Sequence, residues 1–352
     1  ELRNTGRVMR LPIAKLTPPP SVQKDDALID SHGRTITDLR ISVTDRCNFR
    51  CVYCMEPDVK YLPKQSLLSL DEYVRLVRVA HELGVTKLRI TGGEPTLYHD
   101  LDSLIECVGE IGFDDVALTT NGTLLTEERC ALWKESGLDR ITISLDTLDS
   151  IKKERITRSF TPLSTVLRSI EMARDVGLTP VKVNAVMIKG VNDDELLSFA
   201  AFAQEYAIDM RFIEFMALDS GRSWSMEKVV TASEMKKVIE REYELVREVD
   251  GASSTSMNYR FASSKGRVGF IASVSQSFCH GCNRLRVLAD GTVRPCLFSD
   301  DEWSVRDLLR SDVSDGVVKQ FFRDACFAKS KGHSMGQEAF MPPMKTMSTL
   351  GG

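Results

Sequence analysis

The sequence has no apolar run long enough to span a bilayer, and it shows no segment with the charged, apolar and small-residue order of a secretory signal. It also lacks a marked excess of one charge, since 46 Lys and Arg stand against 50 Asp and Glu. The nine cysteines are an odd number. These absences predict a cytoplasmic protein with reduced cysteines and no general affinity for membranes or nucleic acids. An anionic substrate would have to be bound by a local group of cations.

No Gly-x-Gly-x-x-Gly follows the first predicted strand, which argues against a doubly wound, dinucleotide-binding sheet. Short β-branched runs instead alternate with amphipathic segments. The predicted strands lie near residues 39–43, 88–90, 116–118, 141–143, 181–186 and 210–213. Ser69–Glu72 and Thr231–Glu234 are capping boxes that open two of the intervening helices. Six β–α units in succession predict an α/β fold, a partial (β/α)6 TIM-type barrel with its helices outside the strands.

The chain divides into three predicted parts. Residues 1–35, with Pro18-Pro19-Pro20 and little periodicity, are expected to form a flexible N-terminal arm. Residues 36–245 form the partial barrel. Residues 246–352 form a C-terminal α+β extension, with a strand near 268–271, a hairpin around Asp290-Gly291, helices near 304–310 and 314–329, and a polar tail.

The first predicted strand leads directly into Cys47, Cys51 and Cys54, in a C-x3-C-x2-C spacing. Three thiolates suit a [4Fe–4S] cluster that keeps one iron free for another ligand. A zinc site would require a fourth protein ligand nearby, and a disulfide framework would require an even number of cysteines in a small secreted chain. Three unrelated loop cysteines remain the other alternative.

Other unusual residues follow the remaining strands, where the loops of a parallel barrel converge. They include Thr91-Gly92-Gly93-Glu94-Pro95, in which paired glycines would allow close backbone approach to a ligand and Glu94 would suit an ammonium. Lys182 lies on the fifth strand among apolar neighbours. It would either pair with a core carboxylate or bind phosphate.

A second group of cysteines occurs in the C-terminal region: Cys279 and Cys282, followed by Cys296 across the hairpin. Three ligands again favour a [4Fe–4S] cluster, although a zinc site completed by His280 remains an alternative. Arg284 and Arg286 alternate along a strand, so both face one side and could bind an anion together.

The order of motifs resembles a known family. C-x3-C-x2-C, G-G-E-P, T-T-N-G, S-L-D, V-K-V-N, F-I-E-F-M, C-x2-C-N-R-x-R with a third cysteine, and a terminal Gly-Gly follow one another from about residue 30 to residue 352. This pattern is similar to the GTP 3′,8-cyclase family of molybdenum cofactor biosynthesis, in the radical S-adenosylmethionine (SAM) superfamily.

The resemblance implies two [4Fe–4S] clusters, with SAM bound at the open iron of one and GTP at the open iron of the other. The implied roles are cluster ligation by Cys47, Cys51, Cys54, Cys279, Cys282 and Cys296; SAM contacts from Tyr53, Gly93, Glu94, Ser144 and Met216; GTP contacts from Arg40, Arg89, Thr119, Lys182, Arg284, Leu285 and Arg286; and catalytic support from Gly351 and Gly352.

The implied reaction is an oxygen-sensitive conversion of GTP to (8S)-3′,8-cyclo-7,8-dihydroguanosine 5′-triphosphate, the first step of the pathway. It would use a flavodoxin-type electron donor and supply a cyclic pyranopterin monophosphate synthase, and the resemblance also allows a homodimer. Two alternatives are another two-cluster radical SAM enzyme, such as a peptide or sulfatase maturase, and a zinc-stabilised binding protein. The first usually has more C-terminal cysteines, and the second would require tetrahedral ligand sets.

Overall fold

The computed structural model describes residues 27–262, 265–335 and 340–351. Its strands form one sheet in the order β12-β11-β10-β1-β2-β3-β4-β5-β6-β9-β8-β7. The eight strands from β10 to β9 are parallel, and antiparallel strands continue the sheet at each end. The strands are β1 (Asp38–Ser42), β2 (Lys87–Thr91), β3 (Asp115–Thr120), β4 (Arg140–Ser144), β5 (Lys182–Met187), β6 (Asp209–Glu214), β7 (Leu245–Arg247), β8 (Met257–Phe261), β9 (Arg267–Ile271), β10 (Arg284–Val287), β11 (Thr292–Arg294) and β12 (Trp303–Ser304).

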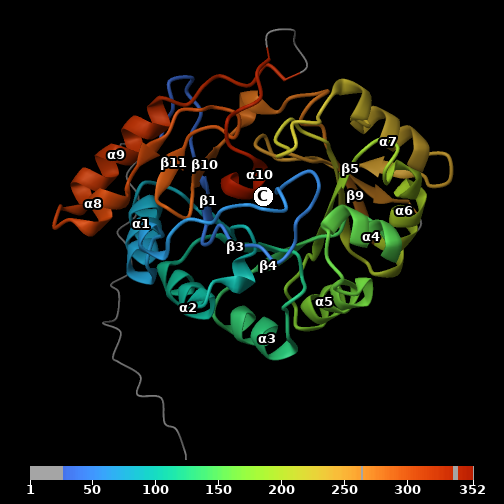
Figure 1. Ribbon diagram of the computed structural model, residues 1–352, viewed down its shortest axis with the longest axis horizontal. Helices are drawn as coiled ribbons and strands as arrows, with labels where there is room; N and C mark the ends of the chain where they lie inside the picture. Colours follow the sequence, from blue (N-terminus) through green and yellow to red (C-terminus); the bar gives the residue numbers. More distant parts are fainter. Residues whose placement is uncertain (1–26, 263–264, 336–339, 352) are drawn as a thin grey trace, which may run out of the picture.

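Helices surround the parallel strands on the outside, as Figure 1 shows, except for the short α10, which lies at the centre of the barrel. They are α1 (Leu70–Glu82), α2 (Leu101–Ile111), α3 (Glu127–Glu135), α4 (Ser150–Thr157), α5 (Leu163–Asp175), α6 (Leu196–Glu205), α7 (Ala232–Ile239), α8 (Arg306–Arg310), α9 (Asp315–Phe327) and α10 (Met347–Leu350). Both predicted capping boxes are present, at Ser69 before α1 and at Thr231 before α7. Helix α4 was not predicted from the sequence, because only eight residues form it and its apolar positions are few.

The parallel strands direct apolar side chains outward and polar side chains into the barrel. In β1, Leu39 and Ile41 are fully buried in the core beneath the helices, whereas Arg40 lines a cavity inside the barrel. Because successive strand residues face opposite sides, a strand with such a pattern can bury its apolar side chains and still contribute polar ones to the barrel interior.

The six predicted barrel strands are confirmed as β1 to β6, and the C-terminal region adds two more parallel strands. Strand β9 pairs with β6, and β10 pairs with β1 in the register Asp38↔Arg284 and Arg40↔Arg286. The C-terminal region therefore continues the barrel sheet at both of its edges. The division at residues 245 and 246 stays a prediction.

The described part of the expected N-terminal arm, residues 27–35, packs against the barrel. Leu28 is fully buried and its backbone N–H donates to the Leu83 carbonyl oxygen, while Ile29 and Thr35 form a β-bridge. The buried Leu28 side chain and these backbone hydrogen bonds hold the segment against the barrel. The packed structure therefore begins before the predicted boundary at residue 35. Residues 1–26 lie outside the described residues.

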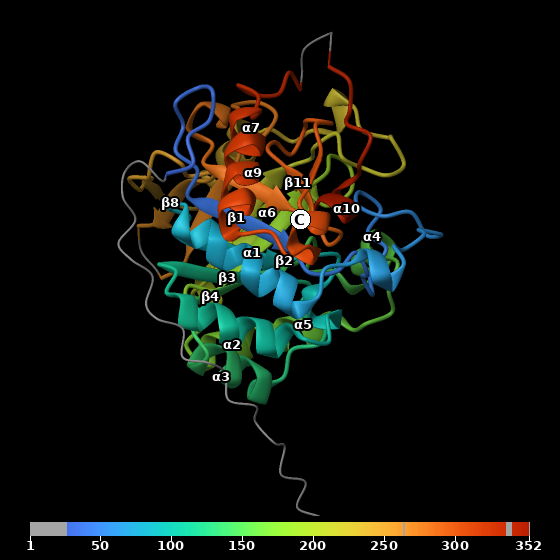
Figure 2. The ribbon, with the colours of Figure 1, turned by 90° about the vertical axis from the view of Figure 1, so that its left-hand side faces the viewer.

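The C-terminal end of the described chain turns into the barrel instead of extending away from it. The C label lies beside α10 at the centre of Figure 1, and Figure 2 shows α10 and α4 on the same side of the molecule. Within the described residues, no helix combines the length and the apolar character needed to cross a membrane.

Candidate functional site

The first cysteine set (Cys47, Cys51 and Cys54) lies in the loop that follows β1, at the carboxyl end of the parallel strands. Backbone hydrogen bonds join this loop to α4: Arg50 N donates to Thr157 O and Val52 N donates to Ile156 O, each at 2.9 Å. All three cysteines line one large cavity in the barrel. Helix α4, which was not predicted from the sequence, therefore supports the loop that carries the first cysteine set.

The Gly92-Gly93-Glu94 loop after β2 lies directly against the cysteine loop. Gly93 N donates to Thr44 O and Glu94 N donates to Arg46 O, both at 2.7 Å. A Cβ on Gly93 would stand 2.4 Å from Arg46 O. The glycines thus permit close approach to the backbone of the cysteine loop, and their predicted close approach to a ligand stays a prediction.

We expect Gly93→Ala to prevent stable formation of the first cluster, because the added methyl group requires the cysteine loop to move. The measurement is iron and sulfide content after reconstitution, with a loss of about four of each per chain. Gly251→Ala is the matched control, because no atom lies within 4 Å of its added Cβ. Full iron content in Gly93→Ala would contradict this prediction.

The carboxylate of Glu94 is already engaged by protein donors. Its Oε1 accepts hydrogen bonds from Thr96 N, Thr96 Oγ1 and Thr120 Oγ1, and its Oε2 accepts one from Asn121 N at 2.7 Å. Burial raises the pKa of Glu94, and these hydrogen bonds oppose that rise. Glu94 thus joins the loops after β2 and β3, and its predicted contact with the SAM ammonium stays a prediction.

Tyr53 and Asp146 form a buried pair beside the first cysteine set. Tyr53 OH donates to Asp146 Oδ2 at 2.6 Å, while Asp146 Oδ1 accepts from Val186 N at 2.9 Å. Burial raises the pKa of Asp146 to about 6. The motif Ser144-Leu145-Asp146 was part of the family resemblance and supplied Ser144 as a predicted SAM contact. Asp146 itself was not among the predicted contacts.

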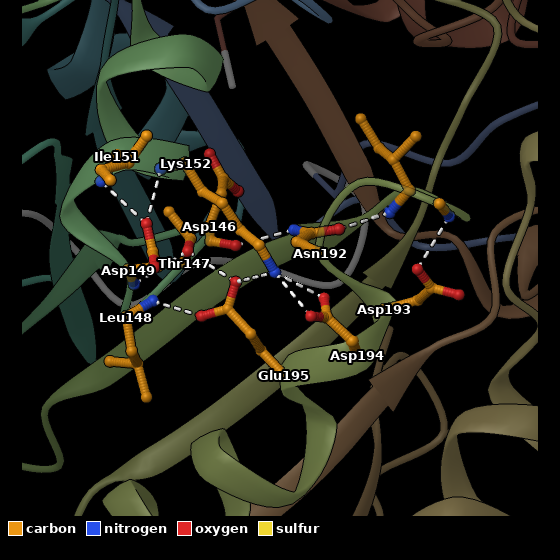
Figure 3. A network of polar contacts seen from close by, with 12 residues as sticks. Asp146, Thr147, Leu148, Asp149, Ile151, Lys152, Asn192, Asp193, Asp194 and Glu195 are labelled. Carbon is orange, nitrogen blue, oxygen red and sulfur yellow. Dashed lines mark hydrogen bonds and ion pairs between the residues drawn. The ribbon is translucent and has the colours of Figure 1, made fainter.

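Figure 3 shows how the loop after β4 is joined to the loop before α6. Asn192 Nδ2 donates to Asp146 O at 2.7 Å, and Glu195 accepts from Thr147 Oγ1 and from Leu148 N. Lys152 of α4 reaches Glu195 at 3.2 Å. These contacts fix the backbone around Asp146. Two further predicted SAM contacts, Ser144 and Met216, line the same cavity.

The second cysteine set (Cys279, Cys282 and Cys296) lines this cavity from its other end. Cys282 lies two residues before the amino end of β10, which pairs with the amino end of β1, whereas the first set follows the carboxyl end of β1. Strand β11 runs antiparallel to β10 and returns the chain to the same end before Cys296. The family resemblance implies two clusters that face each other across the barrel lumen, and the second set lies at the opposite end of the strands from the first.

Five arginines line the cavity between the two cysteine sets, and we call them the lumen arginines: Arg40, Arg89, Arg211, Arg284 and Arg286. The registers place Arg40 beside Arg89 on one side and beside Arg286 on the other. Several buried polar atoms facing this space have no partner in the described structure: Arg40 Nε, Arg211 Nε, Arg284 Nη2 and Asn184 Oδ1. Unpaired guanidinium donors in a closed space point to an anionic ligand.

Burial weakens the proton affinity of these arginines, and their mutual repulsion adds to the effect. The pKa of Arg286 is lowered to about 9 by burial, with Arg40 and Arg284 as further causes. The pKa of Arg211 is lowered to about 10 by burial, with Arg140 contributing. An anion bound among them would relieve this repulsion.

The structure separates the predicted GTP contacts into two groups. Thr119 lines the cavity and accepts a hydrogen bond from Arg89 at 3.0 Å. Lys182 lies one inward position nearer the amino end of β5 than Asn184, and it is not among the cavity-lining residues. The Leu285 side chain is fully buried in the hydrophobic core, so only its backbone is available for a contact. The GTP roles of Lys182 and Leu285 stay predictions.

Sequence reasoning missed Arg211 and Lys329, which both line the cavity. Arg211 had a usable signal, because it is an inward-facing charge between the apolar residues Met210 and Phe212 of a buried strand. Lys329 follows α9 and had no local signal, since only the folded chain brings it to the barrel.

Gly351 lies inside the cavity, beside β1 and β2. Its carbonyl oxygen accepts a hydrogen bond from Arg286 Nη1 at 3.1 Å, and its φ is 76°. A Cβ here would stand 2.1 Å from Ser42 Oγ. Both the backbone conformation and the available space therefore require glycine. Gly352 lies outside the described residues.

The two cysteine sets fit iron–sulfur clusters. None of the nine cysteines is in a disulfide, and burial raises the pKa of Cys47 to about 11 and that of Cys54 to about 12. Such thiols would stay protonated at neutral pH unless a metal stabilised their thiolates. Burial would also raise the pKa of Cys282, but Arg284 and Lys329 lower it to about 7.

Across residues 27–262, 265–335 and 340–351, no three His, Cys, Asp or Glu side chains lie close enough together to hold one metal ion. In a [4Fe–4S] cluster each cysteine binds a different iron, so its ligands stand wider apart than those of a single zinc ion. The zinc alternative gains no support from this geometry.

Two family models match adjoining parts of the chain. The model described as "Radical SAM superfamily" matches residues 41–203, and the model described as "Molybdenum Cofactor Synthesis C" matches residues 208–335. Among solved structures, Streptococcus suis SuiB bound to S-adenosylmethionine is similar with a TM-score of 0.59 and 17% identity, over 82% of this chain and 69% of that chain. The structure of anSMEcpe with bound AdoMet gives a TM-score of 0.55 at 15% identity, over 88% of this chain and 93% of that chain. These likenesses show the radical SAM fold.

Curated relatives match nearly the whole chain. A GTP 3′,8-cyclase of Streptomyces coelicolor is 42% identical over 92% of this chain and 96% of that protein. The mitochondrial GTP 3′,8-cyclase of Arabidopsis thaliana is 41% identical, over 93% of this chain and 84% of that protein. The GTP 3′,8-cyclase of Desulforamulus reducens is 39% identical over 92% of this chain and all of that protein. The chain therefore belongs to the GTP 3′,8-cyclase family of the radical SAM superfamily.

Proposed function

We propose that this chain is a GTP 3′,8-cyclase, a radical SAM lyase that converts GTP to (8S)-3′,8-cyclo-7,8-dihydroguanosine 5′-triphosphate in molybdenum cofactor biosynthesis. The observation that carries the proposal is the placement of the lumen arginines between two three-cysteine sets in one cavity. The curated relatives support the same activity. The maturase alternative is not favoured, and the zinc-stabilised binding protein would leave this cavity unexplained.

When bound, the first cluster and SAM supply the radical chemistry that removes hydrogen from C3′ of the ribose. The chain's own residues hold the reactants. Tyr53, Gly93, Ser144 and Met216 would contact SAM near the first cysteine set. Arg40, Arg89 and Arg211 would bind the triphosphate, while Arg284 and Arg286 lie nearer the second set. Such positioning fixes C3′ toward SAM and excludes water from the reacting atoms.

We further propose that the second cysteine set holds a second [4Fe–4S] cluster whose open iron binds the guanine. Support comes from its three thiols, which line the cavity, and from Arg284, which lines the cavity with them and lowers the pKa of Cys282. A flavodoxin-type electron donor, transfer of product to a cyclic pyranopterin monophosphate synthase, a homodimer and a cytoplasmic location stay predictions from the family resemblance.

The test is an anaerobic incubation of reconstituted protein with SAM, dithionite and GTP deuterated at C3′, analysed by mass spectrometry. We expect GTP-dependent 5′-deoxyadenosine that carries the deuterium, and an equal amount of a nucleotide that has lost it. Deuterium-free 5′-deoxyadenosine formed equally without GTP would reject GTP as the substrate. A lack of SAM cleavage by protein that holds both clusters would reject the proposed chemistry.

Gly351→Ala is expected to lower turnover about 10- to 100-fold without lowering iron content. The added methyl group overlaps Ser42 Oγ, and a positive φ disfavours alanine, so the tail should leave the cavity and release Arg286. Turnover and iron content are measured on the same sample, with Gly251→Ala as the control. Unchanged turnover would show that docking of the tail does not contribute to catalysis.

GTP binding above pH 7 is expected to take up about one proton through Lys182. Burial and the charges of Arg211, Arg140 and Arg89 together lower the pKa of Lys182 to about 7, and Asp209 opposes them. Lys182 is therefore largely neutral at pH 8 in the free protein, and a nearby triphosphate would raise its pKa so that it gains a proton. At pH 6 it is already charged and gains none.

The measurement is calorimetric titration of GTP in buffers of different ionisation enthalpy, with Lys182→Met as the reference. Protons that belong to the nucleotide itself are common to both proteins and cancel in the comparison. Equal proton uptake by the two proteins at pH 8 would show that Lys182 does not sense the triphosphate.

A further inference from the structure

Residues 329–332, which directly follow α9, contact the chain segments that carry the second cysteine set. Lys329 is buried, with 2% of its surface exposed, and its Nζ donates to Arg284 O at 2.9 Å and also to Pro295 O. Arg284 stands two residues after Cys282, and Pro295 directly precedes Cys296. One ammonium therefore joins the two strand ends that position these two cysteines.

Arg34 completes the connection to the third cysteine. Its Nη1 donates to Cys279 O at 2.7 Å and to Lys331 O at 2.9 Å, and its Nη2 donates to Ser330 O at 2.6 Å. Its Nε pairs with Asp30 at 2.6 Å, and that carboxylate also accepts from His32 N and Arg34 N. The guanidinium is thus fixed in one orientation, which brings the Cys279 loop and residues 330–331 together.

The packing agrees with the hydrogen bonds. A Cβ on Gly332 would stand 3.0 Å from Cys279 Cβ and 3.4 Å from its Sγ, so the backbone at Gly332 lies directly against that cysteine. The blue start of the described chain lies beside β10 in Figure 1, which fits the contact between Arg34 and the Cys279 loop. A segment from the start of the described chain and several from its C-terminal region therefore meet at the second cysteine set.

We propose that Arg34 and Lys329 are positioning residues for the second cluster: together they fix the backbones of all three cysteine-bearing segments, and Lys329 also places a positive charge beside the thiolates. This inference rests on the second cluster of the proposed function. A cluster with three thiolates is held only if the three sulfurs keep their mutual spacing, and nearby positive charge favours its more reduced, more negative state. Neither residue needs to touch GTP or SAM for these effects.

The chain offers a matched control in Arg75. This arginine also donates to backbone carbonyl oxygens, those of Leu309 and Val313, and pairs with an aspartate, Asp315, at 2.9 Å. It joins α1 to the C-terminal helices and does not line the cavity. Arg75→Gln therefore removes the same kind of contact from a place without cysteines.

The experiment compares Arg34→Gln, Lys329→Met and Arg75→Gln after anaerobic reconstitution. We expect about eight irons per chain in the parent protein and in Arg75→Gln, and about four in the other two variants. These two should still cleave SAM, because the first cysteine set is intact, and should bind GTP at least tenfold more weakly. Arg34→Lys, which keeps the charge, should recover part of the iron. Where Lys329→Met retains some second cluster, the midpoint potential of that cluster should be more negative than in the parent.

Three outcomes would overturn the inference: full iron content with parental GTP affinity in Arg34→Gln and Lys329→Met, the same iron loss in Arg75→Gln, or a parent protein with only four irons. If Arg34→Gln does not fold, Asp30→Asn replaces it, because that change removes the partner that orients Arg34 and leaves the guanidinium in place. A smaller iron loss from the second set is then expected, and none would count against the inference. A parent with eight irons that does not convert GTP would reject the proposed function, while the iron contents would still decide the roles of Arg34 and Lys329.

Discussion

A Cys51→Ala variant is expected to form no 5′-deoxyadenosine, whereas a Cys282→Ala variant should form it without making the cyclised nucleotide. Cys51 belongs to the set at the carboxyl ends of the strands, beside Tyr53, Gly93 and the other predicted SAM contacts. Cys282 belongs to the set at the amino ends, on the far side of the lumen arginines. The first change should therefore remove the radical chemistry, and the second should remove the guanine site.

The measurement is 5′-deoxyadenosine and nucleotide product in the same reaction, together with iron content. Cys130→Ala is the control, since Cys130 is a fully buried thiol of α3 in the hydrophobic core and is not among the cavity-lining residues. It should keep both activities and lose only a little stability. A Cys282→Ala variant that still formed product would show that the second set is not required for GTP cyclisation.

Arg40→Met is expected to weaken GTP binding about 100-fold and, in the same protein, to raise the melting temperature. A charged hydrogen bond to a buried ligand contributes about 2–3 kcal/mol, which corresponds to about that change in affinity. The opposite effect on stability follows from the free protein, where Arg40 lowers the pKa of both Arg89 and Arg286 and its own Nε has no partner among the described residues. Removing such an uncompensated charge commonly stabilises a fold by about 1–3 kcal/mol.

Arg140→Met provides the contrast, because Arg140 Nε pairs with Asp115 at 2.8 Å. Its loss would leave that carboxylate without its partner, so the melting temperature should fall. Calorimetric GTP titration and thermal unfolding measure both effects. A fall in melting temperature for Arg40→Met would contradict this prediction. It would show that other groups of the protein compensate the charge of Arg40 before an anion binds.

The sequence predicted the parts of this site that follow from local pattern. Strands β1 to β6, the two capping boxes, the cysteine loop after β1 and the shared face of Arg284 and Arg286 all depend on neighbours a few residues away. Such features are specified by side-chain alternation and by cap chemistry. Two of them, the cysteine loop and the Arg284–Arg286 motif, also carried the family resemblance.

The features that the sequence did not predict depend on pairing between distant residues. Strand pairing places β9 beside β6 and β10 beside β1, at the two edges of the barrel sheet. The pairing of β10 with β1 also places the second cysteine set at the amino ends of the strands. Lys329 reaches the cavity only because α9 packs beside the barrel, and Glu94 uses its oxygens on Thr120 and Asn121 of the next strand end. No local pattern encodes these choices.

The pairing of β1 with β10 has a consequence for the time at which the protein can take up iron. Arg34, just before β1, and Cys279, just before β10, are 245 residues apart. At about 5–20 residues per second, a ribosome needs roughly 12 to 50 s to make that stretch. During this interval the cysteine loop after β1 already exists, while the outer edge of β1 has no neighbouring strand and is open to pairing with other chains. If iron is inserted into the first set this early, it enters a sheet in which β10 has not yet paired with β1. The edge of β1 must then be protected from other chains during the same period of synthesis in which iron is delivered.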